Sequence, residues 1–424
     1  MGFNERNWAN NIAYRAARYH EPTTVDELCS VVAAATKVRA IGTRHSFNSI
    51  ADTDGDQVSL AAMPRVVEID EARQTVTVDG GIRYGELAER LQSHGMALAN
   101  LASLPHISVA GACATATHGS GAGNRNLSSA VTAMQLVTAS GEVVEVSRDG
   151  DPRLMDAITV GLGAVGIVTR LTLAIEPTFD VRQTVYEQLP LKTAIASVDE
   201  IMADGYSVSL FTTWRHDRIE QLWCKVRAGR GDDDDRATAA GATRFGAVAA
   251  THKLHPIGQL SAQPCTEQMG VLGPWHERLP HFRMGFTPSS GDELQSELFV
   301  AASDAPRAFR VVRALGHELA PVLQISEVRA IAADTLWLSP CYQRDSIAFH
   351  FTWVPLWRQV QPVLGKLESA LAPFDARPHW GKLSTLSGAV LRTRFERLRA
   401  FGELLTGWDP TGKFRNAFVD AALG

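Results

Sequence analysis

Residues 41–48 read IGTRHSFN, and the rest of the chain is best interpreted outward from them. They follow the β-favouring residues 38–40 and combine a glycine, two hydroxyls, a histidine and an amide within eight positions. This composition suits neither the interior of a helix nor a core strand. A strand that ends in small, donor-rich residues leaves backbone N–H groups free to face an anionic ligand. The stretch therefore predicts an anion-binding loop with His45 in its middle.

Two later segments are also rich in small residues. Residues 103–123 read SLPHISVAGACATATHGSGAG, and residues 161–166 read GLGAVG. Such a density of small residues indicates that the backbone closely approaches another segment or a ligand. Neither segment matches G-x-G-x-x-G between a strand and a helix, and no P-loop is present, which disfavours a Rossmann dinucleotide site. The first half thus predicts an anionic ligand held by Gly-rich loops, although His45 and His118, taken singly, are more often structural than catalytic.

The composition excludes several classes of protein. The chain has 424 residues, of which 45% are hydrophobic, enough for two or three domains. Its net charge of −5 would not attract nucleic acid or an anionic membrane. No apolar run reaches the roughly 18 residues that span a bilayer, and residues 1–15 lack the apolar stretch of a signal peptide. The five cysteines are far apart and form no C-x-x-C pair, which indicates neither a disulfide framework nor a zinc site. We expect a soluble cytoplasmic protein without nucleic-acid or membrane partners.

The first half of the chain alternates short strands and helices. Residues 24–27 form a capping box that predicts a helix to about residue 36. Period-two alternation predicts strands and hairpins, and helical spacing after residue 83 predicts a helix that Gly95 ends. The first domain is expected to end near Pro177. The remaining predicted elements are a strand over 38–42, hairpins over 66–79 and 134–146, a helix over 84–94 and a strand over 167–175.

The second half predicts a different layer arrangement. Its order of strands and helices favours an antiparallel sheet with helices on one face, so the fold class is α+β. Residues 229–263 are interpreted as a partly mobile surface excursion, and their acidic run 232–235 as a solvated face rather than a metal site. One helix is expected in the last forty residues. The other predicted elements are strands over 208–213, 221–226, 282–286, 294–300, 324–331 and 347–353, and helices over 304–319 and 357–371.

Two of these strands carry polar residues on one face. Glu327 and Arg329 are two positions apart and so share a face, and the same holds for His350 and Thr352 on the next strand. The opposite face of that strand is aromatic and needs a core behind it. If the strands are neighbours, the polar face could be the floor of a hydroxyl-binding pocket. A solvated sheet face with a cross-strand salt bridge is an equally open interpretation.

Lys382 lies in the run 379–382, which reads HWGK. A lone lysine is usually a surface residue. Enclosed in a pocket, its pKa would fall and it could act as a base.

Several of these stretches resemble a known family. Residues 42–48, 103–121 and 161–168 resemble the flavin-binding domain of the vanillyl-alcohol-oxidase type. Within that group the chain resembles the alditol oxidases (xylitol and sorbitol oxidases) over essentially its whole length. The motifs that carry this resemblance are ASLPHISVAG at 102–111, CTEQ at 265–268, GPWHERLPHFR at 273–283, FTPSSG at 286–291 and PHWGK at 378–382.

The resemblance implies a domain organisation. A two-part FAD-binding domain would cover residues 1–177, and a substrate-binding cap domain with an antiparallel sheet and helices on one face would cover 178–378. Residues 379–424 would form a C-terminal segment that returns to the active site.

The resemblance also implies a chemistry. Members of this family carry FAD bonded through its 8α-methyl group to a histidine, which by position is His45. They oxidise the terminal CH2OH of a polyol to the aldehyde and reduce O2 to H2O2, so polyol and O2 are the expected partners, with no metal, and a monomer is expected. Together with the strand-face argument, the implied catalytic and polyol-binding residues are Ser103, Glu327, Arg329, His350, Thr352 and Lys382. The implied FAD-binding residues are Gly42, Thr43, Arg44, His45, Ser46, Phe47, Ser103, Ser108, Gly111, Thr115, Thr117, His118, Gly119, Ser120, Gly121, Gly166, Val168 and His379.

The chain departs from the family at one position, and the activity has three competing interpretations. The family commonly has glycine before the histidine, where this chain has Arg44. Aldonolactone oxidases share the flavin domain, an E-x-R strand and a Pro-His-Trp run, whereas residues 102–108 and Gly381 favour an alditol oxidase. A flavin dehydrogenase is the second competing interpretation, and a non-enzymatic flavin- or sugar-binding module is the third.

Overall fold

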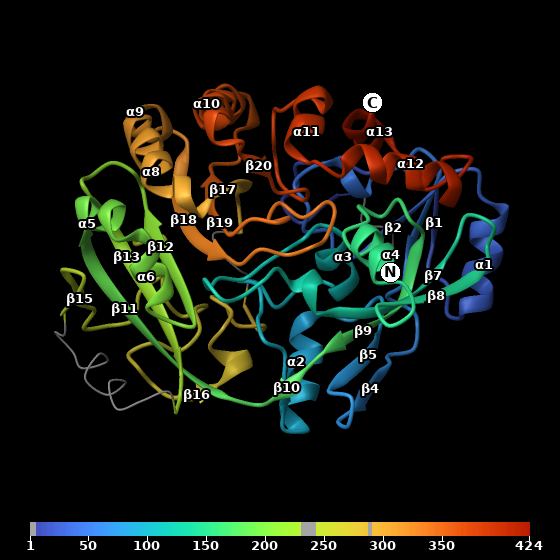
Figure 1. Cartoon of the computed structure of the whole chain (residues 1–424), viewed down its shortest axis with the longest axis horizontal. Coiled ribbons are helices and arrows are strands. Elements are labelled where there is room, and N and C mark those ends of the chain that lie inside the picture. Colours follow the sequence, from blue (N-terminus) through green and yellow to red (C-terminus); the bar gives the residue numbers. More distant parts are fainter. Residues whose placement is uncertain (1–5, 230–242, 287–290) are drawn as a thin grey trace.

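The computed structural model describes residues 6–229, 243–286 and 291–424, and its elements form two parts (Figure 1). The first part, blue to green, contains a three-stranded and a five-stranded sheet with helices around them. The second part, green to orange, has helices along one side of a ten-stranded sheet. The C-terminal helices, in red, lie against the first part. This arrangement confirms the predicted α+β class.

Local signals explain the elements of the first part. The Thr24 hydroxyl accepts a hydrogen bond from the Glu27 N–H at 3.1 Å and so caps the first helix. Gly95, with φ +70°, follows the second helix in the left-handed conformation that suits glycine. Both predicted hairpins, β4-β5 and β7-β8, are present in the antiparallel sheet β4-β5-β9-β7-β8, and a separate parallel sheet has the order β1-β3-β2. The bounds are β1 Arg18–His20, α1 Val25–Ala34, β2 Val38–Ile41, η1 Ser49–Ala51, β3 Asp56–Ser59, β4 Val67–Asp70, β5 Thr75–Asp79, α2 Tyr84–Ser93, β6 Met96–Ala97, α3 Val109–Ala114, η2 Leu127–Ala130, β7 Val131–Val137, β8 Val143–Ser147, α4 Pro152–Ile158, β9 Ile167–Ala174 and β10 Glu176–Pro177.

The large sheet of the second part is antiparallel throughout. Its strand order is β14-β15-β11-β13-β12-β18-β19-β17-β20, and β16 also pairs with β11. The bounds are β11 Asp180–Pro190, α5 Leu191–Ala196, α6 Val198–Ala203, β12 Ser207–Thr212, β13 Arg218–Arg227, β14 Thr243–Arg244, β15 Ala247–Ala249, β16 Gly273–Pro274, η3 Trp275–Glu277, β17 Leu294–Ala301, η4 Ala302–Asp304, α8 Ala305–Ala314, α9 Gly316–Leu319, β18 Leu323–Ile331, β19 Ser346–Trp353, α10 Trp357–Leu371, η5 Ala372–Phe374 and β20 Arg377–Pro378.

The aromatic face of β19 explains why the helices lie on one side. Phe349, Phe351 and Trp353 are fully buried, and Phe349 packs edge-on against Phe309 of α8 at a ring distance of 5.2 Å. Leu364 of α10 belongs to the same core. Because alternate residues of a strand point to opposite faces, this core leaves the other face of the sheet to polar side chains.

Four predictions about secondary-structure elements were wrong, and the first two concern residues 282–286 and 304–319. Residues 282–286 are no strand, since Phe282 makes only an isolated bridge with Cys265 and a turn follows. The helix over 304–319 is divided into α8 and α9, where Gly316 lies so close to the Trp214 carbonyl that a Cβ would meet it at 2.3 Å.

The last forty residues hold three helices instead of one. They are α11 Gly388–Arg394, α12 Leu398–Trp408 and α13 Ala417–Leu423. Leu398, Phe401 and Val419 are fully buried in the core of the first part. This packing stabilises helices that are too short to be stable in isolation.

The excursion over 229–263 is only partly at the surface. Residues 230–242, which include the acidic run, lie outside the described residues. The strands β14 and β15 that follow join the large sheet, and His255 and Ile257 are buried. The predicted surface excursion therefore does not extend to residue 263.

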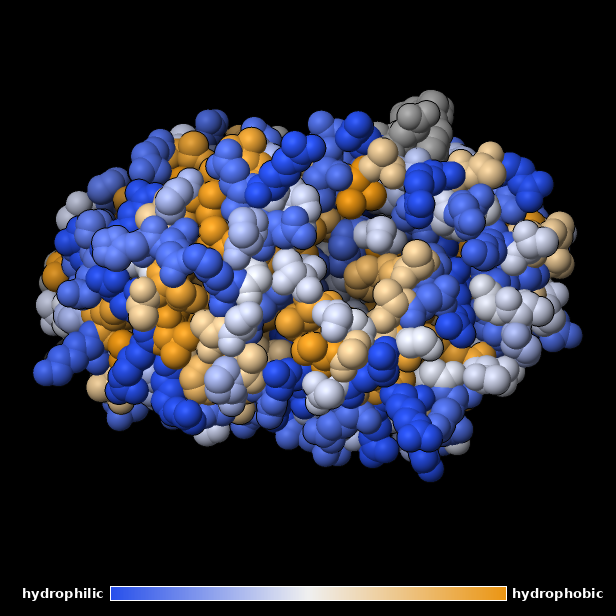
Figure 2. Space-filling view, turned by 90° about the horizontal axis from the view of Figure 1, so that it is seen from above, coloured by the Kyte–Doolittle hydropathy of each residue, from blue (hydrophilic) through white to orange (hydrophobic). Residues whose placement is uncertain are grey.

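The surface is a mixture of hydrophilic and hydrophobic residues. Seen from above in Figure 2, hydrophobic residues are interspersed among hydrophilic ones. Within the described ranges, no helix has the length and apolar character needed to cross a membrane.

Candidate active site

A large cavity lies between the two parts of the molecule. The space between its walls, with the open solvent at its mouth included, is about 1520 Å³. Its lining residues come from the segments 39–47, 102–118 and 379–382 and from the polar face of the large sheet. The cavity therefore brings the loop after β2, the Gly-rich segment and the polar sheet face around one space.

The loop after β2 forms one wall of the cavity. A ring nitrogen of His45, Nδ1, lies 3.1 Å from the Thr43 hydroxyl, and this hydroxyl accepts a hydrogen bond from the Ser108 N–H at 3.1 Å. The indole of Trp8 stacks on the imidazole with a ring distance of 5.6 Å and an interplanar angle of 20°. Burial, assisted by His106, lowers the pKa of His45 to about 4. His45 is therefore neutral at physiological pH and keeps a nitrogen lone pair for bond formation.

The backbone at Arg44 shows why glycine suits this position. Its φ is +63°, a left-handed conformation that glycine adopts without strain. The loop requires this conformation to place His45 in the cavity wall. Arginine adopts it at a cost on the order of 1–2 kcal/mol.

The same loop fits the phosphates of a dinucleotide. Among the described residues, the backbone N–H groups of Thr43, His45 and Ser46 have no hydrogen-bond partner. A Cβ at Gly42 or Gly111 would meet the Ser108 hydroxyl at 2.4 Å or 2.8 Å, so the Ser108 side chain lies close to the backbone at both positions. Free main-chain donors beside closely approaching backbone match the predicted anion-binding loop.

The predicted polar floor is present on the large sheet. Glu327 of β18 is paired with His350 of β19, and His350 is paired with Glu297 of β17. Arg329 and Thr352 lie two residues further on the same face, and all five are less than 10% exposed. The two strands are neighbours, so the pocket interpretation is favoured over the solvated sheet face.

Glu297 is the centre of the charges on this floor. Its Oε1 accepts a hydrogen bond from Arg329 at 2.6 Å, and its Oε2 accepts one from Lys382 at 2.6 Å. The Nε2 of His118 lies 3.3 Å from Oε1. Burial alone would raise the pKa of Glu297, but Lys382, Arg329 and His118 together hold it well below its usual value. Glu297 is therefore ionised.

Lys382 connects Glu297 to His350. Its ammonium lies 2.7 Å from His350 Nδ1, and the other ring nitrogen, Nε2, lies 3.2 Å from the Thr352 hydroxyl. Burial lowers the pKa of Lys382, while Glu297 opposes this effect. Burial and the neighbouring Lys382 lower the pKa of His350 to about 4. Lys382 and His350 therefore form a buried pair in which a proton can be held.

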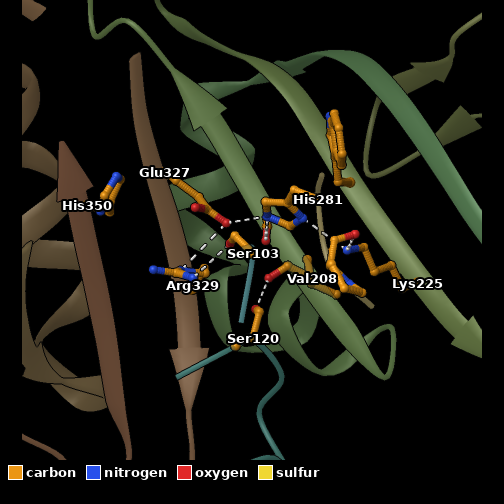
Figure 3. A network of polar contacts seen from close by, with 12 residues as sticks. Ser103, Ser120, Val208, Lys225, His281, Glu327, Arg329 and His350 are labelled. Atoms are coloured by element: carbon orange, nitrogen blue, oxygen red, sulfur yellow. Dashed lines mark hydrogen bonds and ion pairs between the residues drawn. The ribbon is translucent and has the colours of Figure 1, made fainter. Parts of the chain in front are cut away.

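Arg329 connects the floor to the loop that carries Ser103. Its guanidinium donates to the Ser103 hydroxyl at 3.3 Å, and its Nε lies 3.6 Å from Glu327 Oε1 (Figure 3). Burial alone would raise the pKa of Glu327, but Arg329 and His281 lower it far more. Glu327 is thus a permanent hydrogen-bond acceptor on the cavity wall.

The loop and the floor are joined by direct hydrogen bonds. The N–H of Phe47 donates to the Gly381 carbonyl at 2.8 Å. The amide of Asn48 donates to the carbonyls of Trp380 and Lys382, each at 2.8 Å. His45 and Lys382 are thereby held in one rigid assembly.

Most of the predicted site residues meet in the cavity. All six predicted catalytic residues line it, as do thirteen of the predicted cofactor residues, namely Gly42, Thr43, Arg44, His45, Ser46, Phe47, Ser103, Ser108, Gly111, Thr115, Thr117, His118 and His379. Five others are not among the lining residues, namely Gly119, Ser120, Gly121, Gly166 and Val168. Ser120 instead donates to the Val208 carbonyl, as Figure 3 shows.

The sequence did not single out several residues of the cavity. Glu297 and Gln295 lie on β17, which was predicted only as a strand, although a carboxylate inside an apolar strand was a signal of a buried ion pair. His281 and Trp8 come from segments without periodicity. Only the tertiary structure brings these two to the cavity.

Three potential metal ligands also lie close together. Ligand atoms of His118, Glu297 and His379 are within 4.8 Å of one another. Both oxygens of Glu297 already accept from Arg329 and Lys382, whose charges repel a metal ion. We interpret this group as an ion-pair cluster.

Sequence comparisons match both parts of the chain. A family described as "FAD binding domain" matches residues 16–147, and the D-arabinono-1,4-lactone oxidase family matches residues 297–422. The alditol oxidase of Streptomyces sp. (strain IKD472 / FERM P-14339) is 47% identical over 97% of each chain. The L-gulono-1,4-lactone dehydrogenase of Mycobacterium tuberculosis (strain ATCC 25618 / H37Rv) is 28% identical over 99% of this chain and 98% of that protein.

A solved structure has the same fold. Cholesterol oxidase from B. sterolicum superposes with a TM-score of 0.77, covering 99% of this chain and 96% of its own. Its sequence identity is 14%, so the likeness concerns the fold alone.

Proposed function

The chain belongs to the alditol oxidase family of FAD-binding oxidoreductases, and from this premise we propose that it oxidises the terminal primary hydroxyl of alditols such as xylitol and sorbitol. The product is the aldose, and O2 is reduced to H2O2. In this proposal residues 1–177 hold FAD, residues 178–378 supply the substrate pocket, and residues 379–424 return to the site with Lys382.

The observation that carries the proposal is the buried polar floor beside the loop of His45. Glu327, Arg329, Thr352 and Lys382 offer both donors and acceptors on one face. A neutral, hydroxyl-rich substrate satisfies such groups, whereas an analogue lacking a hydroxyl leaves one of them unpaired. This arrangement supports a polyol more than an apolar alcohol.

The loop residues fit FAD, which supplies hydride acceptance and reaction with O2 when bound. We propose that His45 forms the covalent bond and that the free N–H groups of Thr43, His45 and Ser46 bind the phosphates or ring. The lone pair of the neutral His45 supports the first role.

Lys382 holds the proton that the substrate hydroxyl loses. In its neutral form it accepts this proton and shares it with His350, 2.7 Å away. Arg329 and Glu297 fix the charge around the reacting hydroxyl. Glu327, Thr352 and Ser103 bind hydroxyls further along the chain of the polyol.

Replacing Lys382 tests this assignment. We expect Lys382→Met to slow anaerobic flavin reduction by xylitol by roughly 10²- to 10⁴-fold, the usual contribution of a general base. Lys413→Met is the control, since Lys413 is buried and bonded to the Val32 carbonyl away from the cavity. If Lys382→Met reduced its flavin at a rate within a few-fold of wild type, Lys382 would not be the base.

The covalent bond has its own test. Acid-precipitated wild-type protein should keep the yellow colour and fluorescence of flavin, and His45→Ala should lose both. Flavin that leaves the precipitated wild-type protein would contradict the bond.

An aldonolactone oxidase is the second candidate. The match of residues 297–422 to the D-arabinono-1,4-lactone oxidase family covers Glu327, Arg329 and Lys382. The higher identity of the alditol oxidase relative and the motif at 102–108 favour the polyol. Peroxide formed from gulonolactone but not from xylitol would reverse this preference.

A further inference from the structure

A chain of three buried ionisable residues leads from β13 to the cavity. Lys225 Nζ lies 3.0 Å from His281 Nδ1, and His281 Nε2 lies 2.8 Å from Glu327 Oε1 (Figure 3). Their exposed fractions are 1%, 4% and 5%. Of the three, Lys225 lies furthest from the polar floor and is not among the residues that line the cavity.

The hydrogen-bond partners of Lys225 indicate the protonation state of its amine. Besides His281, its Nζ meets the carbonyls of Leu279 at 2.5 Å and Pro280 at 3.3 Å. Carbonyl oxygens only accept, and His281 Nδ1 has no proton when Nε2–H donates to the Glu327 carboxylate, so the three partners need the three N–H groups of an ammonium. Burial lowers the pKa of Lys225 to about 7, with Glu327 acting in the opposite direction.

Lys225 in turn determines the tautomer of His281. Burial, reinforced by Lys225, lowers the pKa of His281 to about 4, so its ring is neutral. Because Nδ1 accepts from Lys225, the ring proton lies on Nε2 and is donated to Glu327. The other tautomer would set a lone pair against the carboxylate.

This contact fixes the carboxylate of Glu327. Oε1 accepts from His281 and faces Arg329 Nε, whereas Oε2 has no hydrogen-bond partner among the described residues. One carboxylate oxygen is therefore held and the other is available to a ligand.

We propose that Lys225 and His281 are positioning residues for the polyol: Lys225 holds His281 in the Nε2–H tautomer, and His281 holds Glu327 so that its free oxygen accepts a substrate hydroxyl. This inference rests on the proposed polyol substrate. It adds a second layer of residues behind the floor.

The strand order predicts which substrates depend on the contacts from Lys225 through His281 to Glu327. Glu327 and Glu297 lie on either side of His350, so the backbones of their strands are two spacings apart, or about 9.6 Å at the usual 4.8 Å spacing, and the Arg329 guanidinium lies between their carboxylates. A polyol reacting near Lys382 reaches Glu327 only if it is long enough. Xylitol and sorbitol should depend on Glu327 more than glycerol does.

Steady-state kinetics of the FAD-loaded enzyme test the proposal. We expect Lys225→Met to raise the KM for xylitol and sorbitol roughly ten- to hundredfold, as expected for a lost hydrogen bond to a charged group. Its kcat and its KM for glycerol should change only a few-fold. Lys225→Arg, which keeps the cation, should restore the xylitol KM to within a few-fold of wild type.

A double variant separates an effect through His281 from a general loss of structure. His281→Leu should raise the xylitol KM about as much as Lys225→Met, and combining the two should add nothing, since Lys225 acts through His281. Lys413→Met removes another buried lysine and should leave every KM unchanged.

The outcomes are distinguishable. If the wild-type enzyme oxidises neither xylitol nor sorbitol, the proposed function is wrong and the positioning role is wrong with it. An active wild type in which Lys225→Met behaves as Lys413→Met, or in which the double variant is additive, overturns the positioning role alone. Should Lys225→Met fail to accumulate, an unchanged xylitol KM for His281→Leu overturns it equally.

Discussion

Arg44 shows how one position can constrain the backbone conformation of a loop. Its left-handed φ of +63° is a conformation for which glycine is the usual residue. The sequence alone marked Arg44 as a departure without a reason, because backbone dihedrals depend on how the loop packs against Trp8 and residues 379–382. The structure shows why glycine suits the position, and nothing in the residues it describes explains the arginine.

A glycine at this position should therefore stabilise the protein. We expect Arg44→Gly to unfold with a free energy about 1 kcal/mol higher than Arg44→Ala, because alanine retains the strain of positive φ. Both variants lose the arginine side chain, so their difference isolates the backbone term. Thermal and urea unfolding of the FAD-loaded proteins measure it, and equal stabilities would contradict the account.

At the scale of elements, strands were more predictable than helices. Alternation located β17, β18 and β19 and placed Glu327, Arg329, His350 and Thr352 on one face, because a strand repeats every two residues. It could not show which strands pair. Neighbours in the sheet are set by tertiary packing, which is why Glu297, across β19 from Glu327, was missed.

The short C-terminal helices and residues 282–286 were unpredictable for a related reason. Burial in the core of the first part stabilises α12 and α13, and α11 packs against that core through the partly buried Leu391. Residues 282–286 have strand-forming composition, but pairing is limited to the bridge of Phe282 with Cys265. Local sequence does not contain such information.

The pairing of β17 with β19 leads to a prediction for Glu297. Its charge raises the pKa of Lys382 against the effect of burial, so Glu297→Gln should lower that pKa further. In the proposed mechanism neutral Lys382 is the base, so flavin reduction should rise with pH as Lys382 loses its proton. In Glu297→Gln this rise should shift to lower pH, and the plateau rate should fall because Lys382 and Arg329 lose their shared partner.

Anaerobic stopped-flow reduction by xylitol across pH measures both effects. Glu368→Gln is the matched control, since Glu368 is a buried carboxylate bound to Ser384 and Thr385. It should leave the profile unchanged. A Glu297→Gln profile that moves to higher pH, or does not move, would contradict the role of Glu297.

At the scale of the molecule, the site exists only where the two parts meet. The loop of His45 comes from the first part, the polar floor from the large sheet, and Lys382 from the segment that follows β20. The sequence indicated each piece separately, and the family resemblance related them. Their joint geometry, including the hydrogen bonds from Phe47 and Asn48 to residues 380–382, required the folded chain.

The central claim is that this assembly oxidises an alditol. The most direct measurement is peroxide formation by the FAD-loaded enzyme with xylitol, sorbitol and gulonolactone under air. We expect peroxide at a several-fold higher kcat/KM with xylitol or sorbitol than with gulonolactone. Peroxide from gulonolactone alone, or flavin that none of the three substrates bleaches, would contradict the account.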